Sequence, residues 1–154
     1  MSALKLIERG AAMQDDFQGE QGEVEVITEE VGPEIEYRVT ATIPDEALVG
    51  EYLRWLIEGH LEAVIAGGAY QASLLQRVDA DPAEIESVYR FASEEDFATY
   101  EKDFAPALRA EGLARFGESG ISFSRRVSLY LATLEVDEEV SRSLRRGFRG
   151  APIC

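Results

Sequence analysis

Residues 34–131 of the sequence predict an α+β fold of the ferredoxin-like type, a βαββαβ sandwich with helices packed on a sheet. Four segments in this range alternate apolar and polar residues, which is the period of a strand with one buried face. Two segments between them carry apolar residues at the spacing of a helix that packs on a core. The order of these elements predicts the fold but no activity, because this fold supports many unrelated functions.

The first strand and the first helix have clear patterns. Across residues 34–43, odd-numbered positions are apolar, and even-numbered positions are charged or carry a hydroxyl. A helix is expected over 46–66, with Asp45 as its N-cap and Gly67-Gly68 as its stop. Its apolar stripe is wider than contact with one sheet requires, so part of the helix is expected to face something else.

The second half of the predicted domain repeats the pattern. Residues 70–78 and 85–92 alternate on either side of a turn and predict a hairpin. Ser93 opens a second helix with a sequence close to a capping box. Pro106 has no backbone N–H, so it is expected in the first turn of a separate helical segment over 106–116. The last strand is expected over 121–131.

The two ends of the chain are interpreted as additions to this domain. Residues 1–33 are expected to be poorly ordered or accessory, with a short helix over 3–12 and an extra strand over 23–30. A turn before residue 34 is expected to pair that extra strand with the first strand of the domain. Residues 132–154 are expected to form a C-terminal tail, with a short helix that begins at residues 137–139 and a basic segment at the end.

Composition and charge restrict the partners. The net charge of −15 would repel nucleic-acid phosphates and anionic membrane surfaces, so neither partner is expected. No segment approaches the ~20 apolar residues of a membrane span, and the amino terminus makes a poor signal peptide. The only cysteine is Cys154, which excludes a disulfide within the chain. These features together predict a cytoplasmic protein.

One face of the predicted sheet carries three arginines among small hydroxyl residues, namely Arg38, Arg90 and Arg126. One interpretation is an anion-binding face, because the arginine fork binds carboxylate and phosphate groups through paired hydrogen bonds. The other is a solvated or dimer-facing surface on which each arginine pairs with an acid such as Glu36, Glu84 or Glu86.

His60 is the only histidine, so any imidazole chemistry must use it. It lies near the C-terminus of the first helix, where the helix dipole is expected to favour a protonated ring. It is a candidate general base or ligand contact, or else a partly buried residue that bonds a carbonyl or carboxylate. Trp55 and Tyr89 are candidates for an apolar ligand pocket, or else ordinary core residues. Neither a metal nor a cofactor is predicted, because no second histidine and no glycine-rich phosphate loop is present.

The runs at 52–78 and 88–117 resemble an uncharacterised bacterial domain-of-unknown-function family of the dimeric α+β-barrel group of ferredoxin-like proteins. The matching features are Trp55, His60, the glycine stop, Ala-Pro-Ala-Leu-Arg at 105–109 and Arg-Phe-Gly at 115–117. The resemblance implies a dimer whose sheets face each other, with ligands between sheet and helices or between the sheets. The group includes haem-degrading and antibiotic-biosynthesis monooxygenases, muconolactone-type isomerases and stress-induced proteins. This chain shows no haem-ligand or flavin motif, so no catalytic residues are transferred.

Two functions remain open at the level of sequence. One is a barrel-like homodimer that binds a small organic molecule, in particular an organic anion. The other is a non-catalytic interaction or regulatory homodimer without a small-molecule site. A homodimer is expected in both cases, because a sheet with helices on only one face leaves its other face and its edges in need of cover.

Overall fold

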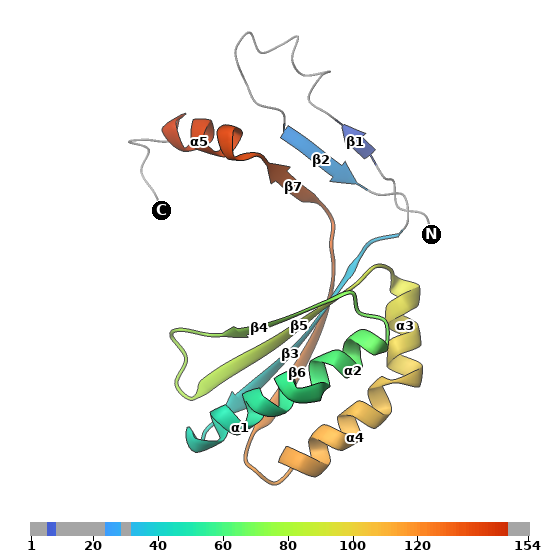
Figure 1. Cartoon of the computed structure of the whole chain (residues 1–154), viewed down its shortest axis with the longest axis vertical. Helices are drawn as coiled ribbons and strands as arrows, with labels where there is room; N and C mark the ends of the chain where they lie inside the picture. The colour runs from blue at the N-terminus through green and yellow to red at the C-terminus, as the bar shows by residue number, and fades with distance from the viewer. Residues whose placement is uncertain (1–5, 9–23, 29–31, 148–154) are drawn as a thin grey trace. The chain divides into compact units, whose positions relative to one another are not determined.

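The computed structural model describes residues 6–8, 24–28 and 32–147 of the chain (Figure 1). The chain divides into two compact units, of which the larger spans Pro33–Tyr130. The smaller unit combines segments from both ends of the chain. We describe each unit by itself.

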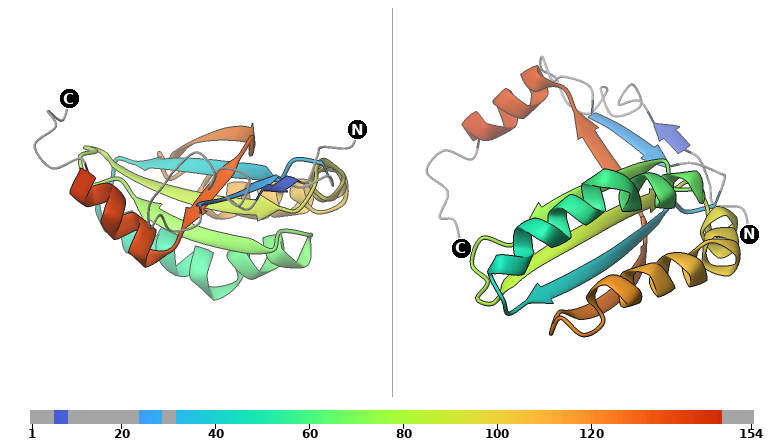
Figure 2. Two further views of the ribbon diagram at one scale, coloured as in Figure 1. Left: turned by 90° about the horizontal axis from the view of Figure 1, so that it is seen from above. Right: turned by 60° about the horizontal axis from the view of Figure 1, so that its bottom comes forward.

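The larger unit is a four-stranded antiparallel sheet with helices on one face (Figure 1), and Figure 2 shows the same arrangement from two other sides. The strand order is β4-β5-β3-β6, the order of a ferredoxin-like sheet, so the α+β prediction is confirmed. Its strands are β3 (Ile35–Ile43), β4 (Gln71–Gln76), β5 (Ala83–Phe91) and β6 (Ser122–Leu129). Its helices are α1 (Ala47–Trp55), η2 (Leu56–His60), α2 (Leu61–Ala66), α3 (Glu94–Asp103) and α4 (Ala105–Phe116).

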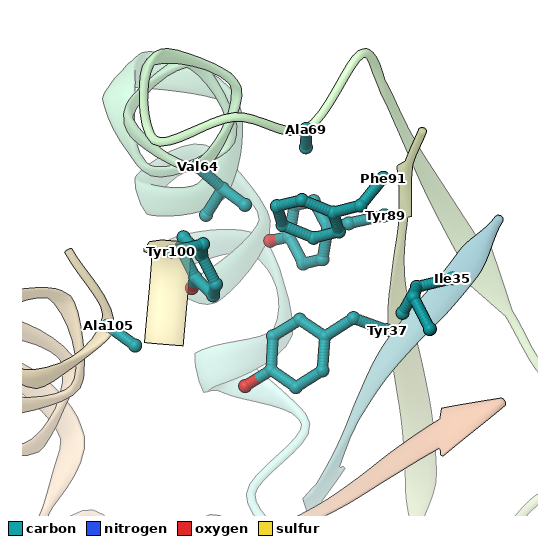
Figure 3. Close-up of a cluster of buried hydrophobic side chains, with 8 residues drawn as sticks. All are labelled: Ile35, Tyr37, Val64, Ala69, Tyr89, Phe91, Tyr100 and Ala105. Atoms are coloured by element: carbon teal, nitrogen blue, oxygen red, sulfur yellow. The ribbon is translucent and has the colours of Figure 1, made fainter. Parts of the chain in front are cut away.

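Strand β3 lies at the centre and pairs along its length with β5 and β6. Residues directly opposite in such a pair share one face of the sheet, so Tyr37 and Tyr89 lie side by side. Their rings project toward the helices, where Val64 and Tyr100 face them (Figure 3). The predicted alternation therefore produces the apolar core between sheet and helices.

The structure confirms the predicted N-cap of α3 at Ser93, whereas the N-cap of α1 is Glu46 and the predicted Asp45 lies one residue earlier. The Asp45 carboxylate accepts the backbone N–H of Ala47 at 3.0 Å, and the Ser93 hydroxyl accepts that of Asp96 at 3.1 Å. After α2 the chain turns at Gly68, whose φ of 127° lies in the left-handed region that glycine tolerates best. The segment predicted as one helix over 46–66 is helical but not regular throughout, because the π-helical turn η2 lies between α1 and α2.

The smaller unit contains the three-stranded antiparallel sheet β1-β2-β7 and helix α5. These elements are β1 (Leu6–Glu8), β2 (Val24–Thr28), β7 (Thr133–Val136) and α5 (Glu138–Gly147). The predicted helix over 3–12 is wrong at β1, which is a strand paired with β2. The predicted pairing of the extra strand with β3 is also wrong, because β2 pairs with β1 and β7. The rest of the predicted N-terminal disorder and the end of the tail lie outside the described residues.

None of the helices within the described ranges combines the length and the apolar composition that crossing a membrane requires.

Candidate functional site

A cavity of about 350 Å³ lies between the sheet and the helices of the larger unit. Side chains from strands β3, β5 and β6 form one wall, and side chains from α1, η2, α3 and α4 form the other. The lining is mostly aromatic or aliphatic and comprises Tyr37, Val39, Tyr52, Trp55, His60, Tyr89, Tyr100, Leu108, Arg109, Gly112, Leu113, Phe123 and Arg125. Two of the predicted ligand contacts, Trp55 and Tyr89, therefore meet the candidate base His60 at one site.

Four tyrosines line the cavity, two from the sheet and two from the helices. Burial raises the pKa of Tyr52 to about 12 and also raises the pKa values of Tyr89 and Tyr100. These phenols are therefore neutral near pH 7. Neutral phenols can each donate or accept a hydrogen bond from a bound molecule.

The buried hydroxyl of Ser87 lies close to two of these phenols. Ser87 is 1% exposed, and its Oγ has no partner at good hydrogen-bond geometry among the described residues. It nevertheless lies near enough to Tyr52 and Tyr89 to offset part of the rise in their pKa values. A buried hydroxyl without a partner costs free energy. The Ser87 hydroxyl is thus a buried polar group next to two cavity tyrosines, although Ser87 itself does not line the cavity.

Trp55 and His60 form a stacked pair, with ring centroids 4.2 Å apart and planes inclined by 25°. In a regular α-helix, residues five apart point about 140° away from each other around the axis. The π turn of η2 contains an extra residue, which brings these two side chains to the same side. This turn therefore places His60 on the cavity wall.

The ionisation of His60 differs from the prediction based on the helix dipole. Burial lowers the pKa of the His60 ring, and the negative charge of Glu111 offsets only part of that effect. The ring is therefore neutral near pH 7 and offers a lone pair. Its Nδ1 atom is buried and has no hydrogen-bond partner within the described part of the chain.

The cationic groups of the cavity are Arg109 on α4 and Arg125 on β6. Arg109 donates to both carboxylate oxygens of Glu101, at 2.9 and 2.8 Å, and the nearby Tyr37 phenol is the main cause of its raised pKa. Arg125 lies opposite Val39 in the sheet, on the helix-facing side. It takes part in none of the ion pairs among the described residues. No aspartate or glutamate lines the cavity, so the charged groups of its lining are these two arginines, of which Arg109 is paired with Glu101.

The three arginines predicted as anion ligands do not line this cavity. Arg38 donates to Glu86 at 2.8 Å and to Glu36 at 3.1 Å, so two of the acids named in the pairing interpretation contact it. Arg38 and Arg126 lie directly opposite each other in the sheet. Both border a shallow groove of about 620 Å³ on the open face of the sheet, which the Arg125 side chain also reaches.

Arg90 lies apart from that groove, among acidic and aromatic side chains. It donates to the Glu34 carboxylate at 2.7 Å. Its guanidinium lies 4.2 Å from the centre of the Tyr130 ring and 5.7 Å from that of Tyr70. Tyr70 in turn donates its hydroxyl proton to Glu34. Arg90 is thus held by protein groups on several sides.

Sequence reasoning did not identify the cavity residues Arg109 and Arg125, nor Ser87, which is buried next to the cavity tyrosines Tyr52 and Tyr89. A usable signal existed for two of them, because Ser87 and Arg125 interrupt the apolar rows of their strands on the helix-facing side. A polar residue in such a row marks a place where the core meets a polar group. Within the ranges that the structure describes, no three His, Cys, Asp or Glu side chains gather as a metal site would require.

Solved structures with a similar fold include two dimeric ferredoxin-like proteins from an uncultured marine organism. One is 12% identical, with a TM-score of 0.47 over 64% of this chain and 96% of that chain. The other is 10% identical, with a TM-score of 0.49 over 65% of this chain and 96% of that chain. A NIPSNAP family protein with unknown function from Agrobacterium tumefaciens is 13% identical, with a TM-score of 0.46 over 62% of this chain and 87% of that one. These similarities carry no conclusion about function.

The chain matches no curated protein. Residues 34–130 match a family model described as a domain of unknown function. The matched range coincides with the larger unit, which contains the cavity and the arginine-bearing sheet. The chain belongs to this family, DUF4286.

Proposed function

We propose that the protein binds a small organic anion, with an apolar ring-containing body, in the cavity between sheet and helices. The observation that carries the proposal is the character of this cavity. It encloses about 350 Å³, has mainly aromatic walls and contains two arginines but no carboxylate. Ligand sites typically combine this size and apolar lining with a few polar groups. The absence of acids from the lining is notable in a chain of net charge −15.

The lining assigns a role to each part of such a ligand. Trp55 and Tyr89 would contact the apolar body, while Arg125 would bind the anionic group through its fork of N–H donors. Arg109 would add positive charge, although Glu101 already occupies its fork. The tyrosine hydroxyls would orient the remaining polar atoms of the ligand.

A pair of matched ligands tests the preference for an anion. We expect 2-naphthoate to quench the fluorescence of the only tryptophan, Trp55, and to bind at least tenfold more tightly than its neutral amide. A tenfold preference corresponds to about 1.4 kcal/mol, just below the ~1.5–3 kcal/mol of one hydrogen bond to a charged group, so it is a minimum expectation. Equal affinities would contradict recognition of an anion.

Substitution of two neighbouring arginines distinguishes an anion site in the cavity from one on the open face of the sheet. Arg125→Gln should remove the preference for naphthoate over the amide, because Arg125 lines the cavity. Arg126→Gln removes the same charge from the next residue, which lies on the open face beside Arg38, and should leave the preference intact. Loss of the preference in Arg126→Gln, with or without a loss in Arg125→Gln, would place the anion site in the open-face groove that Arg38 and Arg126 border.

Blocking the cavity provides a second test. A side chain at Gly112 would point toward Trp55, since its Cβ would lie 3.3 Å from the edge of that ring. Gly112→Leu should therefore abolish quenching by naphthoate. Ala110→Leu adds a leucine to an exposed position of the same helix and should have no effect. Undiminished binding by Gly112→Leu would refute the cavity as the ligand site.

A homodimer with an interaction function is the second candidate. The open face of the sheet favours it, because Arg38 is already paired with acids there and the helices cover only the opposite face. Light scattering at micromolar concentration should then give twice the chain mass of 17.1 kDa. A monomer mass would exclude a function that depends on assembly through this face.

A further inference from the structure

The stacked pair of Trp55 and His60 separates two different environments. One side belongs to the aromatic cavity. The same two residues also line an outer groove of about 330 Å³ between the π turn and α4. The charged residues of that groove are Glu51, Arg54, Glu58, Glu111 and Arg115. His60 is therefore part of a partition between an apolar cavity and a charged surface groove.

The charges on the two sides of this partition are opposite in character. The cavity contains two arginines, together with neutral tyrosines, and no acid. The groove contains three glutamates and two arginines, and one of these glutamates, Glu51, pairs with Arg115 at 3.2 Å. Glu111 is in none of the ion pairs formed among the described residues, so its charge acts on the nearby His60 ring. The arginines favour a negative charge in the cavity, and Glu111 offsets part of the cost of a positive charge on the buried His60 ring.

We propose that His60 takes a proton from the bound molecule, so that the cavity captures weak organic acids and holds them as anions. This inference rests on the proposed function and specifies the ligand class: a phenol or enol on an apolar body, which keeps its O–H proton near neutral pH in water. The O–H bond of the ligand breaks, its electron pair stays on the oxygen, and the proton joins the free lone pair of the imidazole. The products are an anion beside Arg125 and an imidazolium stabilised by Glu111 from the groove.

The geometry supports a proton acceptor at this position. The π turn directs His60 onto the cavity wall and stacks it on Trp55, which restricts the orientation of the ring. The Nδ1 atom is buried and has no partner among the described residues, so a molecule in the cavity would meet the other ring nitrogen, Nε2. Burial also keeps the His60 ring neutral before a ligand binds. An anion bound next to the ring then makes the imidazolium form favourable.

The chain contains one tryptophan and one histidine, and both line the cavity. Trp55 fluorescence can therefore measure binding, and the His60 NMR signal can independently measure proton transfer. The probe is 4-nitrophenol, a weak acid whose anion absorbs visible light while the neutral phenol does not. It is added at about one pH unit below its own pKa, where roughly a tenth of the free probe is ionised. Binding is measured by quenching of Trp55, and proton transfer by probe absorbance and by the His60 ring signal in NMR spectra.

We expect the bound probe to be mostly ionised and the His60 ring signal to move to the imidazolium position. His60→Gln keeps a hydrogen-bonding side chain but no basic nitrogen, so this variant should still bind the probe, now as the neutral phenol. Glu111→Gln should lower the ionised fraction several-fold. Glu118→Gln removes the same charge from a position outside the cavity and the groove, and should change nothing.

The outcomes separate this inference from the proposed function. Quenching of Trp55 by a probe that stays neutral, with an unchanged His60 signal, overturns the proton transfer and leaves ligand binding standing. Full ionisation of the probe in His60→Gln also overturns it. If neither 4-nitrophenol nor 2-naphthoate quenches Trp55, the proposed function fails and this inference fails with it. The wild-type NMR signal decides the question even where the variant does not fold.

Discussion

Arg90→Ala should destabilise the larger unit, because the protein itself occupies the Arg90 guanidinium. Its ion pair with Glu34 has an N–O distance of 2.7 Å, and its guanidinium lies over the Tyr130 ring at 4.2 Å. An arginine reserved for an exogenous anion would instead be unengaged in the free protein. Removing such an arginine would leave stability unchanged or raise it, because neighbouring positive charges repel.

The expected magnitude follows from the exposure of the two partners. The side chains of Arg90 and Glu34 are 26% and 36% exposed, so solvent screens part of their attraction and the pair contributes about 0.5–1 kcal/mol. The contact with the Tyr130 ring contributes a similar amount, about 0.5–1 kcal/mol. Arg90→Ala should therefore lower the free energy of unfolding by about 1–2 kcal/mol, below the ~3–5 kcal/mol of a fully buried pair.

Urea unfolding followed by Trp55 fluorescence provides the assay, because Trp55 lies in the same unit as Arg90. The midpoint should fall while the slope with urea stays the same. Arg126→Ala is the matched control. Arg126 belongs to none of the ion pairs in the described part of the chain and faces Arg38, so its removal should change stability by less than about 0.5 kcal/mol.

A double-mutant cycle with Glu34→Gln attributes the loss to the ion pair. If Arg90 and Glu34 interact as the structure shows, the two substitutions together should cost less than the sum of their separate effects. Unchanged or increased stability of Arg90→Ala would refute the structural role. It would return Arg90 to the anion-binding interpretation of the open face.

Three further predictions follow from packing and ionisation. Gly67→Ala should lower the free energy of unfolding by about 1–3 kcal/mol, because the new Cβ would lie 2.9 Å from the Tyr100 ring. Gly50→Ala is the control: its Cβ would have nothing within 4 Å, so the substitution should be neutral or stabilising. Thermal unfolding compares the two variants. Burial raises the pKa of Tyr52 from 10.0 to about 12. The stability that the neutral, buried Tyr52 phenol contributes should therefore be complete below pH 10 and be lost as pH rises toward 12. Urea midpoints and phenolate absorbance across this pH range test the prediction. The His60 pKa lies below 6.5, so its contribution is present above pH 6.5 and is lost as pH falls through the folded-state value; an NMR midpoint above 6.5 would contradict this.

Local sequence determined the parts of the fold that depend on neighbouring residues. The alternation in 34–43 decides which side chains of β3 face the helices, because successive residues of a strand point to opposite faces. The Ser93 cap and the glycine turn at Gly68 were predictable for the same reason, since each involves backbone groups a few residues away. The cavity wall at Trp55 and Tyr89 also follows from these rows.

The tertiary structure decided what depends on residues far apart in the sequence. Strand β2 pairs with β7 across more than a hundred residues, and no local pattern distinguishes that partner from the adjacent β3. Glu34 and Glu86 determine which arginines are engaged, and both are distant in sequence from the arginines that they bind. Arg125 becomes a cavity residue only because β6 and α4 pack around the same space. Periodicity specifies the face on which a side chain lies, whereas its partner, its ionisation and the space in front of it depend on packing between elements.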